Sequence, residues 1–175
     1  MYTRKLCLFL SILLLTGLSF FNASAQKPSA TDPKTNKYKG LQISRTDLIN
    51  SLSVADSLLH FKQVPNTKGT PKFAAKGSFG ARIEITGTED NLTLAQWMVS
   101  QPANGTLSRL AFTQMAFFID LLAKQEGAMW FFQQAFLYTK TPTSPISSST
   151  IIDANKLMFT YYPAKKTFTI TVSPQ

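Results

Sequence analysis

Two runs of residues decide the fold of this protein: Leu-Met-Phe-Thr-Tyr-Tyr at 157–162 and Thr-Phe-Thr-Ile-Thr-Val at 167–172. The four residues between them read Pro-Ala-Lys-Lys, a polar connection. In the second run Phe168, Ile170 and Val172 alternate with three threonines. Successive side chains of a strand point to opposite faces of a sheet. The pattern therefore predicts a β-hairpin with one face packed against helices and the other face wet.

A second hairpin is predicted earlier in the chain. Residues 78–88 alternate, with Phe79, Ala81, Ile83 and Ile85 on one face and Arg82, Glu84 and Thr86 on the other. Residues 87–91 read Gly-Thr-Glu-Asp-Asn, which is a turn composition, and residues 92–99 follow as the second strand. In that strand Leu92, Leu94 and Met98 are expected on one face and Trp97 on the other. A helix is the alternative for residues 92–99, because Ala-Gln-Trp-Met suits either structure.

Three segments carry the apolar spacing of an amphipathic helix. Residues 46–61 form the first, with Thr46 or Asp47 expected to cap its start. Residues 107–126 form the strongest helix, and Gly127 is expected to end it before a third helix over residues 128–138. Polar and charged residues interrupt the apolar run of residues 107–126, which indicates a core helix rather than a membrane span.

The remaining segments read as loops, and the order of elements sets the fold class. Residues 64–77 contain Pro65, Gly69, Pro71 and several lysines, and residues 139–150 are polar with two prolines. The sequence thus predicts an α+β domain over residues 40–175. We expect a roughly four-stranded antiparallel sheet, made of two hairpins, with about three helices packed on one face.

The N-terminal segment reads as a signal peptide over residues 1–25. Arg4 and Lys5 precede an apolar run at residues 6–15, and Ala23 and Ala25 are the small residues that signal peptidase requires before its cleavage site. An uncleaved anchor, extended through residues 20–21, is the alternative. We expect the product to be exported to the periplasm, the cell surface or the medium, with no transmembrane segment left after cleavage. Cleavage would also remove the sole cysteine, Cys7, and with it disulfide and thiolate chemistry.

Charge is unevenly distributed along the chain, whose formal net charge is +9. Residues 26–39 are polar and basic and read as a flexible linker. The basic excess lies before residue 83, and the candidate binding residues of that part are Lys62, Lys68, Lys72, Lys76 and Arg82. Such asymmetry suggests an anionic partner, an unknown protein or an envelope component; scattered lysines that keep the protein soluble are the alternative. No nucleic-acid partner is expected, because no motif for one is present.

The residue types give little support to catalysis. His60 is the sole histidine, and we expect it at the end of the first helix, beside the last carbonyl groups. Asp56 lies one helical turn before it, but no Gly-x-Ser-x-Gly motif accompanies the pair. No glycine-rich phosphate loop or set of zinc ligands is found, so neither a metal nor a cofactor is expected. The tryptophans and tyrosines are expected to serve the core rather than a sugar-stacking platform.

Two classes of function follow from these observations. The first is an exported, non-catalytic small domain that binds a protein or an envelope component. The alternative is a small hydrolase that acts on glycan or peptidoglycan through two carboxylates brought together by the fold, since such a pair has no sequence signature.

Overall fold

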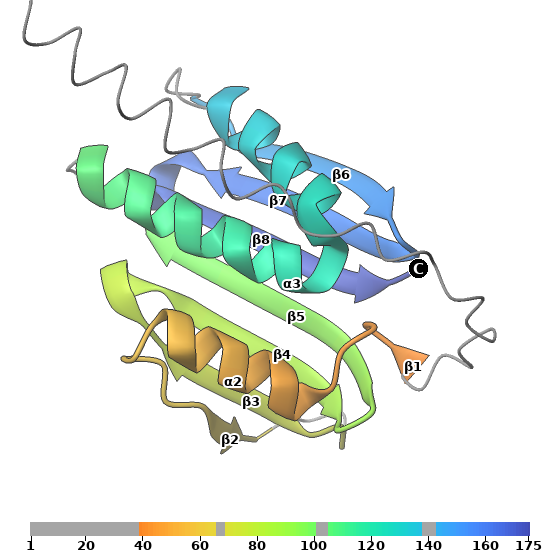
Figure 1. Cartoon of the computed structure of the whole chain (residues 1–175). Helices are drawn as coiled ribbons and strands as arrows, with labels where there is room; N and C mark the ends of the chain where they lie inside the picture. Colours follow the sequence, from red (N-terminus) through yellow and green to blue (C-terminus); the bar gives the residue numbers. More distant parts are fainter. Residues whose placement is uncertain (1–38, 66–68, 101–104, 138–142) are drawn as a thin grey trace, which may run out of the picture. The chain divides into compact units, whose positions relative to one another are not determined.

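The computed structural model describes residues 39–65, 69–100, 105–137 and 143–175, which form one sheet and two helices. The strands are β1 (Lys39–Gly40), β2 (Lys62–Val64), β3 (Lys72–Lys76), β4 (Arg82–Thr88), β5 (Asn91–Ser100), β6 (Ile146–Ile152), β7 (Asn155–Tyr162) and β8 (Thr167–Pro174). Seven of them form an antiparallel sheet in the order β2-β3-β4-β5-β8-β7-β6, and β1 pairs in parallel with β5 (Figure 1). The α+β class predicted from the sequence is confirmed.

The C-terminal hairpin forms as predicted. Strands β7 and β8 pair from Asn155–Pro174 to Tyr162–Thr167, and a short 3-10 turn at Pro163–Lys165 joins them. Phe168, Ile170 and Val172 are buried on one face, because alternate residues of β8 point toward the helices.

The hairpin of β4 and β5 also forms, but the two faces of β5 differ from the prediction. Ala95, Trp97 and Val99 point into the core, whereas Leu94 and Met98 lie on the opposite face and are half-buried. The ladder shifts by one residue between Thr86 and Gly87, so Leu92, at the start of β5, is also buried. A β-carbon at Gly87 would lie 2.3 Å from the carbonyl oxygen of Asn91, so only glycine fits this shift.

The sheet is larger than the predicted four strands, because both expected loops contribute strands. Residues 64–77 supply the end of β2 and all of β3, and residues 139–150 supply most of β6. Phe73 of β3 faces the core side, where the guanidinium of Arg45 lies 4.5 Å from its ring centroid. Strand β6 lies at the edge and is more exposed, so its sequence carries the serines that resemble a loop. Strand β3 lies next to the edge strand β2, and its two lysines, Lys72 and Lys76, both lie on its solvent-facing side.

The first helix, α2 (Arg45–Ala55), is shorter than predicted. Ser44, not Thr46 or Asp47, caps its start, and the Ser44 hydroxyl accepts a hydrogen bond from the Asp47 backbone N–H at 3.0 Å. The helix ends at Ala55 because Asp56 takes an extended conformation. The predicted continuation to residue 61 is therefore wrong.

The second helix, α3 (Gly105–Leu137), contains both remaining predicted helices, so the described part of the chain has two helices rather than about three. Its backbone breaks at Ala123 and Lys124, where Lys124 has a positive φ of 55°. The expected break at Gly127 is wrong, because Gly127 lies inside the second half of α3 and is buried. The buried side chain of Asn155 in β7 donates a hydrogen bond to the Leu122 carbonyl at 2.7 Å. This bond satisfies a backbone carbonyl at the break, where the regular hydrogen bonds of the helix are interrupted.

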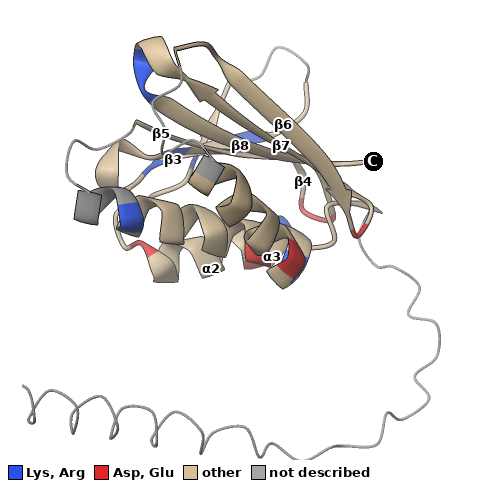
Figure 2. Ribbon diagram, turned by 90° about the horizontal axis from the view of Figure 1, so that it is seen from above, with Lys and Arg blue, Asp and Glu red and all other residues tan. Residues whose placement is uncertain are grey.

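Both helices lie on the same side of the sheet (Figure 2). The core between these layers contains the largest fully buried side chains: Trp97, Phe118, Phe131, Phe159, Leu41, Leu48, Leu52, Ile83, Ile85, Leu92, Met115 and Ile119. No described helix covers the other face of the sheet, which we call the open face. The predicted division into a packed face and a wet face is confirmed for the described residues.

Candidate functional site

The strand register places four of the five predicted binding residues on the open face. Lys62 lies opposite Ala74, Ala74 lies opposite Glu84, and Lys76 lies opposite Arg82. Paired residues point to the same side of a sheet, as do residues two positions apart in a strand. We call Lys62, Lys72, Lys76 and Arg82 the basic patch. Lys68, Ala23 and Ala25, the other predicted site residues, lie outside the described residues.

A shallow depression of ≈ 480 Å³ lies within the basic patch. Lys62, Lys76 and Arg82 contribute to its rim, and its lining is completed by Leu58, His60, Val64, Ala74 and Ala75. The depression therefore combines cationic side chains with small and aliphatic ones. An anionic group with an adjoining apolar part fits this combination.

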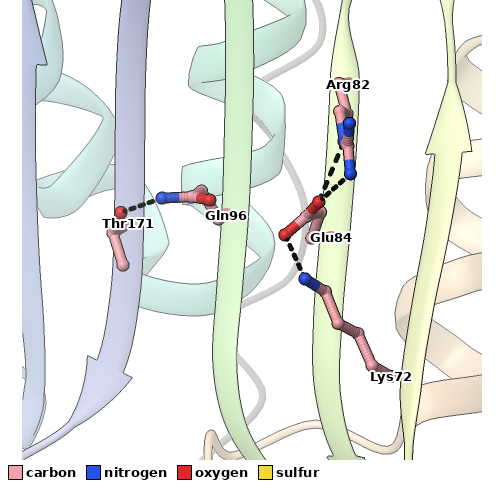
Figure 3. Close-up of polar contacts among 5 residues, drawn as sticks. All are labelled: Lys72, Arg82, Glu84, Gln96 and Thr171. Carbon is pink, nitrogen blue, oxygen red and sulfur yellow. Dashed lines mark hydrogen bonds and ion pairs between the residues drawn. The ribbon is translucent and has the colours of Figure 1, made fainter. Parts of the chain in front are cut away.

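Glu84 lies at the centre of the salt bridges in the basic patch. Its carboxylate binds Lys72 Nζ at 2.6 Å and Arg82 Nη2 at 2.6 Å, and it accepts a further hydrogen bond from Arg82 Nε at 2.9 Å (Figure 3). The Glu84 side chain is only 11% exposed, although the alternation of β4 places it on the wet face. The Arg82–Glu84 spacing of two residues is the one sequence signal for this contact.

The environment of Glu84 favours its ionised form. Burial raises the pKa of the Glu84 carboxyl, because it disfavours a charge. The hydrogen bonds and positive charges of Lys72 and Arg82 together outweigh burial and hold the pKa below its ordinary value. Glu84 therefore carries a negative charge at neutral pH and fixes two of the basic side chains in place.

One carboxylate does not balance the charge of the basic patch. Among the described residues, no carboxylate lies within ion-pair distance of Lys62 or Lys76. Arg82 keeps outward donors as well, because its side chain is 56% exposed although it pairs with Glu84. The basic patch thus has four cationic groups and a single anionic one.

On β5 and β8 the open face has no charged side chain. The Gln96 side chain on β5 donates a hydrogen bond to the Thr171 hydroxyl on β8 at 3.0 Å (Figure 3). Thr167 and Thr169 continue this face along β8, and Thr169 is buried. These two uncharged strands separate the basic patch from Lys156, the cationic residue that β7 places on the open face.

His60 and Asp56 are placed differently from the prediction. His60 is exposed in the segment between α2 and β2 and lines the depression, so its expected position at a helix end is wrong. The buried Asp56 carboxylate accepts hydrogen bonds from the Leu58 N–H, the Ser78 N–H and the Ser78 hydroxyl. Asp56 thus binds the residues around it rather than His60.

Two further described carboxylates, Glu89 and Asp153, each pair with a different basic residue. Glu89 pairs with Arg45, and the Thr46 backbone N–H is the largest of the contacts that lower its pKa. Asp153 pairs with Lys124. Within the described residues, no group of three or more His, Cys, Asp or Glu side chains is arranged to hold a metal ion.

The aromatic residues considered for a sugar-stacking platform are dispersed. Trp97 and Tyr161 are buried on the helix side, Trp130 is half-buried on α3, and Tyr162 is exposed on the open face. Tyr138 lies outside the described residues. Trp97 packs edge-to-face against Phe118 at 5.5 Å, which confirms the expected core role for this tryptophan.

Among the described helices, none has the length and apolar character needed to cross a membrane. Comparison of the chain with protein-family models, with curated proteins and with solved structures gave no match.

Proposed function

We propose that this protein is an exported, non-catalytic domain that binds an anionic protein or envelope component through the basic patch. The observation that carries the proposal is the convergence of Lys62, Lys76 and Arg82 around one depression on the open face. These residues lie on three different strands, so their charges act together on a single ligand group.

The charge balance of the patch supports binding of an anion. Lys62 and Lys76 have no described carboxylate partner, so a ligand would add a favourable interaction without replacing one. The pair of Lys72 and Arg82 with Glu84 holds the adjacent part of the patch rigid, which lowers the entropy lost on binding. Leu58 and Val64 offer apolar contacts beside the charges.

The proposal is tested by co-sedimentation of the protein with lipid vesicles and with its own cell-envelope fraction. Vesicles of mixed phosphatidylglycerol and phosphatidylcholine present negative charge, and vesicles of phosphatidylcholine alone serve as the uncharged control. We expect binding to the anionic vesicles or to the envelope fraction, weakened as salt rises from low to physiological strength. Binding to the envelope fraction alone would identify a non-lipid partner, and binding to neither would contradict the proposal.

Two double variants that remove the same charge distinguish the contribution of the basic patch to binding from that of net charge. Lys62→Gln with Lys76→Gln should weaken binding about thirtyfold, because each lysine near an anionic surface contributes about 1 kcal/mol. Lys165→Gln with Lys166→Gln removes the same charge from the exposed turn between β7 and β8. An equal loss in both double variants would show that net charge, and not the basic patch, governs binding.

A further inference from the structure

The two edges of the sheet differ in length and in protection. Strand β2, at one edge, has three residues and carries Lys62. Strand β6, at the other edge, has seven residues with the sequence Ile-Ser-Ser-Ser-Thr-Ile-Ile. Among the described residues β6 pairs with β7 alone. Lysine, glutamate and proline are residues that hinder an edge strand from pairing with another chain, and β6 contains none of them.

The hairpin geometry shows which backbone groups of β6 point outward. Asp153 and Ala154 form a two-residue turn with φ values of 50° and 62°, so Ile152 and Asn155 are a hydrogen-bonded pair. Pro174, which has no N–H, lies opposite Asn155 on the other side of β7, in agreement with this assignment.

Hydrogen-bonded and non-hydrogen-bonded pairs alternate along an antiparallel ladder. The residues of β6 that direct their backbone N–H and C=O groups away from β7 are therefore Ser147, Ser149 and Ile151. Their side chains are exposed on the open face, where they lie beside β7. The outer edge of β6 thus offers three regularly spaced pairs of backbone N–H and C=O groups, with the pair of Ser149 in the centre.

The sequence of β6 is nearly symmetric about Ser149. Antiparallel pairing of β6 with the same strand of a second copy, centred on Ser149, would place Ile146 of each copy opposite Ile152 of the other. It would also place Ser148 opposite Thr150, a pair of hydroxyl side chains that suits cross-strand contact. Because β6 has no charged residue, no like charges meet in this register.

The helix side of β6 provides room for the partner's side chains. A groove of ≈ 550 Å³ lies between the second half of α3 and the end of β6, and its lining includes Met129, Trp130 and Ile152. Met129 is 56% exposed and so gives the groove an accessible apolar side chain. In the register centred on Ser149, the partner's Ile146 lies opposite Ile152 and therefore beside this groove.

We propose that β6 is a homodimerisation edge, at which two copies of the chain pair antiparallel about Ser149 and extend the sheet across a twofold axis. Such an interface is isologous, with the same surface on both copies. It lies at the opposite edge of the sheet from β2, so dimerisation and binding at the basic patch can be tested separately.

The test measures association by sedimentation velocity over a wide range of protein concentration, with the protein expressed from its full sequence and purified from the producing cells. Wild-type protein should show a concentration-dependent dimer. Ser149→Lys and Ser149→Asp should each raise the dimer dissociation constant at least about tenfold, because two like charges would face each other across the axis. An equimolar mixture of the two variants should restore the dimer, because lysine then faces aspartate.

Gln63→Lys, an exposed change on the opposite edge strand, is the matched control and should leave the dissociation constant unchanged. Circular dichroism and urea unfolding show whether each variant keeps the fold. Three results would each overturn the proposal: a wild-type monomer at every concentration, a dimer that is insensitive to Ser149→Lys, or a mixture of charge variants that stays monomeric.

Discussion

Ser78 donates both its backbone N–H and its hydroxyl to the carboxylate of Asp56, at 2.7 and 3.0 Å. The contact joins the end of α2 to the turn before β4, two segments that are 22 residues apart. A β-carbon at the neighbouring Gly77 would lie 2.7 Å from the same carboxylate, so a glycine is needed beside it. Because Asp56 ends α2, the chain after it runs to β2 and brings His60 to the basic patch.

Replacement of Asp56 by alanine should destabilise the fold. The change leaves three donors without their acceptor, including the Ser78 N–H, and hydrogen bonds to a charged group contribute about 1.5–3 kcal/mol. We expect the free energy of unfolding to fall by about 2–3 kcal/mol in urea titration at neutral pH. Asp120→Ala, on the exposed side of α3, should change it by less than about 0.5 kcal/mol. Equal losses in the two variants would contradict the assigned role of Asp56.

The break in α3 should depend on Asn155. Asn155→Ala removes the donor to the Leu122 carbonyl and leaves a buried acceptor unpaired, at a cost of about 1–3 kcal/mol. Hydrogen exchange should also become faster in the second half of α3, because that bond links the helix to β7. Gln133→Ala, an exposed amide of the same helix half, provides the control. If exchange in α3 is unchanged in Asn155→Ala, the bond does not hold the break.

Gly127 should resist substitution although it lies inside a helix. Alanine is favoured over glycine there by about 1 kcal/mol of helix propensity. A β-carbon at residue 127 would, however, lie 2.6 Å from that of Ala123, 3.0 Å from Ile119 and 3.3 Å from Leu157. Overpacking of this kind costs about 1–3 kcal/mol, so Gly127→Ala should lower the melting temperature. Ala123→Gly in the same chain removes the closest contact and should recover part of the loss, and a double variant no more stable than Gly127→Ala would contradict this explanation.

Glu84 should make folding sensitive to acid. Its pKa in the folded protein is held below the ordinary value of 4.5, so its contribution is present above that value and is lost as pH falls through the folded pKa. The stability difference between wild type and Glu84→Gln should therefore shrink as urea titrations move from neutral pH to below pH 4.5. Glu126→Gln, an exposed carboxylate of α3, should show a smaller change with pH. A difference that grows on acidification would contradict the assignment.

The same variant should strengthen anion binding at neutral pH. Glu84→Gln releases Lys72 and Arg82 from their carboxylate partner and leaves four cations in the basic patch without an internal anion. We expect the affinity for anionic vesicles or for the envelope fraction to rise severalfold, with a steeper dependence on salt. Co-sedimentation at several salt concentrations measures both quantities. Weaker binding by a folded Glu84→Gln variant would indicate that Glu84 itself contacts the partner.

The local pattern of side chains was sufficient for the central strands and for most of the helical residues. The alternation of Phe168, Ile170 and Val172 with threonines predicted β8 and its wet face, because a central strand beside one covered face must alternate. The apolar spacing of residues 107–126 predicted the first half of α3, because a helix with one covered face repeats its apolar residues every three to four positions. The excess of basic residues before residue 83 also predicted which part of the sheet carries the basic patch.

Contacts between distant segments decided the rest. Strands β3 and β6 form because a neighbouring strand pairs with them, so their lysines and serines gave no strand pattern. The break in α3 falls where Asn155, from β7, reaches the Leu122 carbonyl, and no local rule places it there. Glu84 became the centre of the basic patch only when β3 brought Lys72 beside β4. Periodicity is set by the burial of one face of an element, whereas pairing, breaks and charge clusters depend on residues that only the folded chain brings together.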